Sequence, residues 1–183
     1  FSISSADELS LTSREFFAQH GIALRLNDRA TRIDREQRLV HTAQGAALPY
    51  DRIVLATGSY PFVPPIPGRE RAGCFVYRTI EDLEAIRAAA SVARVGTVIG
   101  GGLLGLEAAN GLMLRGMDVT VVHVMPWLME RQLDDTAGKL LQKSLEARGI
   151  RFEIGAHTEA LIPDKDGRVM AIRFKDGREL PAD

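Results

Sequence analysis

Residues 98–109 read VIGGGLLGLEAA, and this stretch decides the fold class of the chain. Gly100, Gly102 and Gly105 have the spacing of a dinucleotide-binding loop, G-x-G-x-x-G. In such a loop the first glycine allows a tight turn, the second lets the backbone approach a pyrophosphate, and the third lets a helix pack closely on a strand. The spacing therefore predicts a strand, a phosphate-binding turn and a helix in succession.

The residues around the glycine loop alternate between helical and extended patterns. Helices are expected at 81–90, 103–115 and 134–148, and strands at 97–100, 118–123 and 151–154. Such alternation favours a parallel sheet with crossover helices, which is a Rossmann-like α/β fold. The tail, with extended runs at 159–163, 168–175 and 178–180, predicts an antiparallel β-meander with tight turns.

A proline-rich run at 61–68 separates this α/β region from the residues before it. The run holds Pro61, Pro64, Pro65 and Pro67 and ends at Gly68. Proline fixes its own φ and donates no backbone hydrogen bond, so we expect a stiff, extended linker. Residues 1–60 are then one domain and residues 69–183 a second. In the first domain the expected elements are a short helix at 13–20 and strands at 23–26, 30–34, 38–42 and 52–56.

Composition excludes several function classes. The 183 residues are 45% hydrophobic and 26% charged, which is typical of a globular protein. A formal net charge of -1 argues against nucleic acid and anionic lipid as partners. A single cysteine, Cys74, cannot form a disulfide, a zinc cluster or an iron–sulfur cage within this chain. The scattered histidines lack ligand spacing, so no metal site is expected.

The ends of the chain and its apolar runs suggest where the protein belongs. No apolar run approaches the roughly 20 residues that span a bilayer, and residues 1–10 do not have the pattern of a secretion signal. We therefore expect a cytoplasmic protein without a membrane segment. The chain starts without Met and stops at Asp183 without a closing turn, so we also expect a piece of a longer protein, cut within the second domain.

The glycine loop is the strongest candidate site. A helix that begins after such a turn presents unpaired N–H groups and the positive end of its dipole to an anion. The candidate contacts for a nucleotide pyrophosphate are Gly100, Gly101, Gly102, Leu103, Leu104 and Gly105. A glycine turn that only joins a strand to a helix is the alternative. The next strand ends about 20 residues further on, at the position where this fold places the residue that hydrogen-bonds the ribose, and this favours nucleotide binding.

The residue at that second strand end is His123, where an Asp or Glu would indicate NAD. Strict NAD selectivity is thus not indicated, and the coenzyme is written NAD(P)H. His123, assisted by Arg131, could donate to a 2′-phosphate, although an ordinary surface histidine is the alternative. Glu107 is a candidate contact for the nicotinamide half of the coenzyme, and a solvated helix residue is its alternative.

A second cofactor signal lies directly before the proline-rich run. Residues 50–59 read YDRIVLATGS and predict a buried strand that ends in the small residues Ala56, Thr57 and Gly58. Small residues at a strand end permit close approach of a ligand. Taken alone, this is a generic strand and turn.

The order of an Ala-Thr-Gly strand end, a proline-rich run and a glycine loop resembles the pyridine nucleotide–flavin oxidoreductase family over essentially the whole chain. Within that family, PFVPPIPG at 61–68, FVYRTIEDL at 75–83 and HVMPWLMERQLD at 123–134 resemble the large subunits of assimilatory NAD(P)H-dependent nitrite reductases. The resemblance implies a two-domain dinucleotide-binding flavoprotein in which hydride passes from the nicotinamide of NAD(P)H to FAD. It places Ala56, Thr57 and Gly58 beside FAD, and Gly100, Gly102, Gly105 and Glu107 in the NAD(P) site.

The same resemblance limits what this chain can do alone. That family has an earlier FAD-binding glycine loop, a later flavin-contacting segment and cysteine-rich regions for an iron–sulfur cluster and sirohaem, none of which is present here. We expect an electron-input portion that serves an acceptor domain or subunit and is inactive by itself, with a homodimer left open. The alternatives are a stand-alone NAD(P)H-dependent ferredoxin or rubredoxin reductase and a non-catalytic nucleotide-binding domain. No catalytic side chain is expected, because the two rings carry the hydride chemistry.

Overall fold

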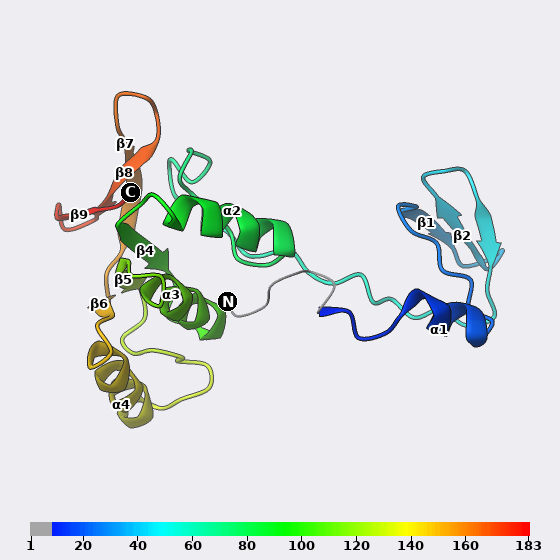
Figure 1. The fold of residues 1–183 in the computed structure, drawn as a ribbon, viewed down its shortest axis with the longest axis horizontal. Helices are drawn as coiled ribbons and strands as arrows, with labels where there is room; N and C mark the ends of the chain where they lie inside the picture. The colour runs from blue at the N-terminus through cyan, green and yellow to red at the C-terminus, as the bar shows by residue number, and fades with distance from the viewer. Residues whose placement is uncertain (1–8) are drawn as a thin grey trace. The chain divides into compact units, whose positions relative to one another are not determined.

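The computed structural model describes residues 9–183, and the chain divides into two compact units. The first unit ends at Ser59 and the second runs from Tyr60 to Asp183. Figure 1 shows the helices and strands of both units.

The first unit contains one short helix and one small sheet. Helix α1 (Arg14–Gln19) begins after Ser13, whose hydroxyl oxygen accepts a hydrogen bond from the Phe16 N–H. Strands β1 (Ala30–Asp34), β2 (Leu39–Thr42) and β3 (Ala47–Pro49) form an antiparallel sheet with β2 in the centre. The strand expected at 30–34 is confirmed with the same bounds.

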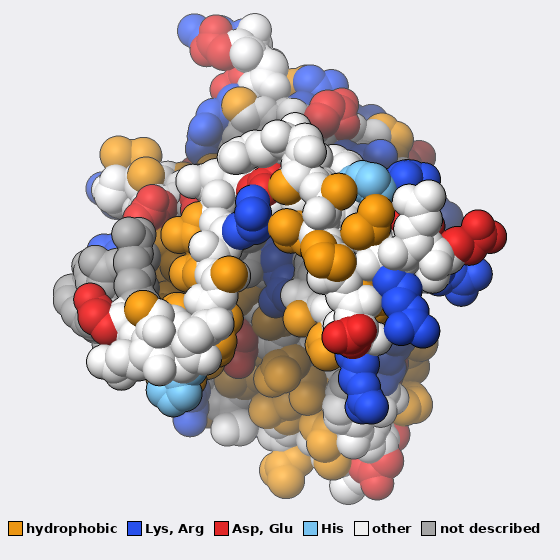
Figure 2. Space-filling view, turned by 90° about the vertical axis from the view of Figure 1, so that its right-hand side faces the viewer, with side chains coloured by type: hydrophobic (Ala, Val, Ile, Leu, Met, Phe, Trp, Pro, Cys, Tyr) orange, Lys and Arg blue, Asp and Glu red, His pale blue; other side chains and the backbone are white. Residues whose placement is uncertain are grey.

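Two expected strands of this unit are wrong. Residues 23–26 and 52–56 lie outside helices and strands. The side chains of Val54 and Leu55 are exposed to 88% and 66%, so the predicted burial of this run is also wrong. A strand needs hydrogen-bonding neighbours along its edges, and among the described residues no strand pairs with either run. Figure 2 shows hydrophobic side chains at the surface on the side that it faces.

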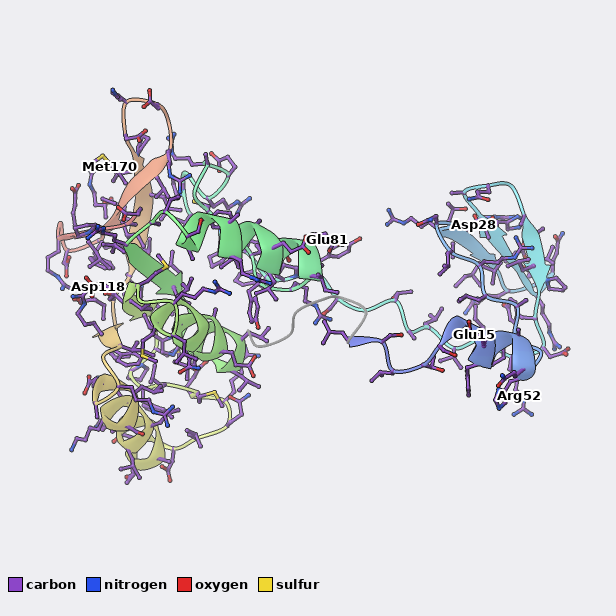
Figure 3. All side chains as sticks on the ribbon, in the orientation of Figure 1. Glu15, Asp28, Arg52, Glu81, Asp118 and Met170 are labelled. Atoms are coloured by element: carbon purple, nitrogen blue, oxygen red, sulfur yellow. The ribbon has the colours of Figure 1, made fainter. Side chains whose placement is uncertain are left out.

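The second unit begins its regular structure with α2 (Ile80–Ala90). Thr79 and Asp82 form the reciprocal hydrogen bonds of a capping box at its start. Glu81 lies in the first turn of this helix, as Figure 3 shows.

The expected parallel sheet follows α2. Strands β4 (Val95–Ile99), β5 (Asp118–His123) and β6 (Arg151–Ile154) run parallel in that spatial order, with β5 in the centre. Helix α3 (Leu103–Met113) packs on β4 and β5, and α4 (Asp135–Glu146) packs on β6 (Figure 1). The parallel sheet with crossover helices is therefore confirmed.

Strand β5 is buried from Val119 to His123, and its two faces enter different cores. Val119 and Val121 pack in a cluster with Leu106 and Ala109 of α3. Val122 points to the other face and packs in the cluster of the antiparallel sheet. A strand covered on both faces is typical of a parallel sheet between layers.

The tail forms the predicted antiparallel meander. Strands β7 (Thr158–Pro163), β8 (Val169–Phe174) and β9 (Glu179–Pro181) pair in sequence order. Phe174 and Ile172 are almost fully buried in the core of this sheet.

The end of the proline-rich run is bound to this sheet. The Leu161 N–H of β7 donates to the Pro67 carbonyl at 2.9 Å. Gly68 is buried and has φ +90°, and a Cβ on it would lie 2.6 Å from the Leu161 carbonyl oxygen. Pro67 and Gly68 thus pack as part of the second unit, in addition to connecting it to the first.

Replacing Gly68 tests this packing. Gly68→Ala should lower the free energy of unfolding by about 2–3 kcal/mol, because the methyl group meets a backbone oxygen and the residue keeps a left-handed conformation. Gly177→Ala is the matched control, since Gly177 has φ +86° but open space around a Cβ. We expect the control to cost about 1 kcal/mol. Chemical denaturation of the whole chain measures both, and equal losses would contradict the close packing of Gly68.

Candidate functional site

The glycine loop connects the C-terminal end of β4 to the start of α3. Gly100 follows the strand with φ +125°, a conformation that side-chain-bearing residues rarely adopt. Its N–H donates to the Val122 carbonyl at 2.9 Å, so the hydrogen-bond ladder to β5 continues into the loop. The turn is therefore held at the sheet's edge by its own backbone.

Helix α3 approaches this turn so closely that only glycine fits at its third position. A Cβ on Gly105 would overlap the carbonyl oxygen of Gly100. It would also lie 3.5 Å from a methyl group of Val98. The third glycine of the motif thus allows the helix to lie against the strand, as the sequence predicts.

The start of α3 is open. Gly102 is the N-cap residue in extended conformation, and a Cβ on it would have no atom within 4 Å. Helix geometry leaves the first N–H groups without intrahelical acceptors. The described first turn carries no acidic side chain, and Leu103 and Leu104 are more than half exposed. An anion brought here meets unpaired donors, a positive dipole end and no carboxylate from the first turn of the helix.

His123 occupies the end of β5 beside this loop, but it does not face solvent. Its side chain is only 7% exposed. The Gly101 N–H donates to His123 Nδ1 at 3.0 Å, and His123 Nε2 lies 3.2 Å from Glu130 Oε2. A backbone N–H only donates, so Nδ1 is the acceptor and the ring proton sits on Nε2, directed at the carboxylate. Both ring nitrogens are engaged within the protein, and neither is left to donate to a 2′-phosphate.

Gly101 fits between this ring and the neighbouring core. A Cβ on Gly101 would lie 2.7 Å from His123 Cγ and 2.7 Å from a Leu128 methyl carbon. Gly101 therefore has a packing role that the three-glycine motif does not predict.

The loop after β5, residues 124–134, is attached to the glycine loop. The Met129 N–H donates to the Gly101 carbonyl at 3.0 Å, and Met129 has φ +56°. The indole N–H of Trp127 donates to the Leu133 carbonyl at 2.9 Å, within the same loop. These bonds hold Glu130 close to Gly101.

The remaining residues that the sequence predicts for the site lie outside the glycine loop. Arg131 is exposed in the loop after β5, and Glu107 is exposed on α3. Ala56, Thr57 and Gly58 belong to the first unit, where they are exposed and outside regular structure, with φ +72° at Gly58. Glu130, which contacts His123 beside the glycine loop, is not among the residues that the sequence predicts for the site. It lies in the run 123–134 that carries the resemblance, but no fixed spacing identifies it.

A separate pocket of about 360 Å³ lies away from the glycine loop, between the start of α2 and the segment before it. Cys74 is one of its lining residues. Burial, followed by the nearby Glu70 carboxylate, raises the pKa of the Cys74 thiol. The thiol therefore stays protonated at neutral pH and is a poor nucleophile.

Within residues 9–183 no cluster of three or more His, Cys, Asp or Glu side chains could hold a metal ion.

Helix α3 lies at the glycine loop because Gly105 has no side chain, and this can be tested. Gly105→Ala should lower the free energy of unfolding by about 2–3 kcal/mol through overpacking against Gly100. Gly102→Ser is the matched control at the preceding glycine of the motif, where a side chain has room and can cap the helix. We expect the control to keep or slightly raise the stability. Thermal and denaturant unfolding measure both, and a stable Gly105→Ala variant would contradict the close contact.

Comparison with known proteins adds family context to this geometry. The family described as "Pyridine nucleotide-disulphide oxidoreductase" matches residues 3–183. The chain is 47% identical to the nitrite reductase [NAD(P)H] large subunit of Klebsiella oxytoca over 98% of its length, and 42% identical to the assimilatory nitrate reductase electron transfer subunit of Bacillus subtilis (strain 168), also over 98%. It spans only 18% and 23% of those two relatives.

A solved structure has the same fold. The ferredoxin reductase for the CYP199A2 system from Rhodopseudomonas palustris superposes with a TM-score of 0.91 at 29% identity, over 97% of this chain and 43% of that chain. Among the helices of the described residues, none is both long and apolar enough to cross a membrane.

Proposed function

This chain belongs to the pyridine nucleotide-disulphide oxidoreductase family, and from that premise we propose that it is the NAD(P)H-binding, electron-input portion of a flavoprotein oxidoreductase. In this proposal residues 1–60 are part of an FAD-binding domain, 61–68 a linker and 69–183 the NAD(P)-binding domain. The chain spans 18% and 23% of the length of the two curated relatives named above, so the activity of the whole enzyme is also a proposal.

The observation that carries the proposal is the open backbone surface of residues 100–105 at the start of α3, which we call the phosphate cradle. A pyrophosphate would be held by the backbone of residues 100–105, with Gly102 leaving room for it and the N–H groups at Leu103 and Leu104 facing it. Glu107 would lie toward the nicotinamide half, and His123 and Arg131 would lie at the adenosine end. These residues fit the pyrophosphate of NAD(P)H, because the cradle offers donors and space and the first turn of α3 carries no acidic side chain.

The residues of the first unit do not build a flavin cradle by themselves. Ala56, Thr57 and Gly58 are small enough for close approach, yet the run before them is exposed and unpaired. In the proposal FAD is bound by the intact protein, where it accepts hydride from the nicotinamide. The task of this chain is to bind and orient the coenzyme, and no side chain is assigned an acid–base role.

The acceptor of the electrons is proposed from the relatives. The names of a nitrite reductase large subunit and a nitrate reductase electron transfer subunit support a portion that passes electrons to an acceptor domain or subunit. In this proposal the intact enzyme lies in the cytoplasm and reduces nitrite to ammonia. The likeness to a ferredoxin reductase supports a second candidate, a reductase that serves a separate carrier protein. A non-catalytic nucleotide-binding domain is the third reading.

The visible spectrum of the intact protein, before and after anaerobic addition of NADH, separates these readings. Flavin bands that bleach, accompanied by haem-like absorption, are expected for a sirohaem nitrite reductase. Flavin bands that bleach without haem-like absorption would favour the reductase for a separate carrier. A protein without flavin that also fails to reduce ferricyanide with NADH would contradict an oxidoreductase function.

Substitution of Gly102 tests the cradle itself. Gly102→Asp should preserve stability, since Asp caps a helix well and has room here, but should weaken NAD(P)H binding by at least about tenfold because its charge faces the pyrophosphate. Gly102→Asn is the neutral control of the same size and should lose less affinity. Titration of coenzyme fluorescence with the intact protein measures both. Equal affinities in the wild type and a folded Gly102→Asp variant would exclude this loop as the site.

A further inference from the structure

The coenzyme preference of this site depends on a residue that is not at the usual position. In a dinucleotide-binding fold, an acidic side chain about 20 residues after the glycine loop accepts hydrogen bonds from the ribose 2′-hydroxyl. The corresponding residue here, His123, is buried and bonded on both ring nitrogens. A side chain that hydrogen-bonds the ribose at this strand end would therefore have to come from another position in the chain.

Glu130 supplies a carboxylate at this strand end. Its Oε2 lies 3.2 Å from His123 Nε2, and its side chain is 23% exposed. Because the Gly101 N–H fixes the proton on Nε2, the histidine donates to Glu130 and orients the carboxylate. One oxygen is used by the ring, while a carboxylate accepts further hydrogen bonds through its second oxygen.

The backbone holds Glu130 beside the phosphate cradle. The preceding residue, Met129, donates to the Gly101 carbonyl, so the loop and the glycine turn are joined next to the side chain. Gly101 is thus connected to the loop directly, through its carbonyl to Met129, and indirectly, through its N–H to His123 of β5, which in turn bonds Glu130. Two independent connections place the carboxylate at the edge of the site where the adenosine half of a coenzyme would end.

We propose that Glu130 is the specificity-determining residue of this site, with its carboxylate accepting the adenosine ribose hydroxyls and disfavouring a 2′-phosphate, so that NADH is bound in preference to NADPH. This assignment rests on the proposed nucleotide site. His123 is a positioning residue in it, since it holds the carboxylate and the Gly101 N–H without touching the coenzyme.

A purely structural role for Glu130 makes a different prediction. If the carboxylate only receives the His123 hydrogen bond, an uncharged acceptor should serve equally well. If its charge selects the coenzyme, an uncharged acceptor should keep the fold and lose the preference. Glu130→Gln separates the two, because the amide oxygen still accepts from Nε2–H while the negative charge is gone.

The experiment measures dissociation constants of the intact protein for NADH, NADPH and reduced nicotinamide mononucleotide, which lacks the adenosine half. We expect the wild type to prefer NADH by about tenfold or more, and Glu130→Gln to reduce that ratio about tenfold, as expected for loss of a hydrogen bond to a charged acceptor. Binding of the mononucleotide should not change. Asp118→Asn is the matched control, since it removes an exposed carboxylate from the opposite end of β5 (Figure 3) and should leave the ratio unchanged.

Three outcomes would overturn the assignment. A wild-type protein that binds NADPH as tightly as NADH contradicts it without any variant being needed. A folded Glu130→Gln protein with an unchanged ratio shows that Glu130 has only a structural role, and nucleotide binding at the glycine loop then still stands. A wild-type protein that binds neither coenzyme refutes the proposed function, and the specificity assignment with it.

Discussion

The contact between α3 and the turn that ends β4 is the constraint on which the rest of the second unit depends. At Gly105 the helix lies against the Gly100 carbonyl with no space for a side chain. This approach lets Leu106 and Ala109 reach the core beneath the sheet, and it directs the start of the helix toward the turn. One steric condition therefore produces both the packing of the α/β core and the cluster of unpaired N–H groups on which the proposed anion site rests.

A second constraint comes from the burial of β5 on both faces. A ring as polar as that of His123 is costly to bury unless its nitrogens have partners. The Gly101 N–H and the Glu130 carboxylate supply them. The loop after β5 is thereby bonded to the glycine loop, and the carboxylate beside this strand end comes from the loop and not from the strand.

Sequence patterns predicted a helix or strand correctly where the residues that stabilise it lie in the same helical turn or the same unit. The helix expected at 81–90 is such a case, because the capping box that starts it has both partners, Thr79 and Asp82, within one helical turn. The strands at 118–123 and 151–154 match their predicted bounds, since each strand's pairing partners lie in the same unit. The strand predicted at 52–56 failed for the opposite reason: its apolar residues favour a strand, but no described strand pairs with it.

Glycine spacing and hydrophobic periodicity predict the turn, the helix that follows it and a parallel sheet, because these patterns act over short distances along the chain. The role of His123, in contrast, follows from packing in three dimensions. Its position at a strand end is visible in the sequence, but its burial and its partners depend on packing between segments that are far apart in the chain. For the same reason Glu130 emerged only from the fold, since loop geometry, and no fixed spacing, brings its carboxylate to the site.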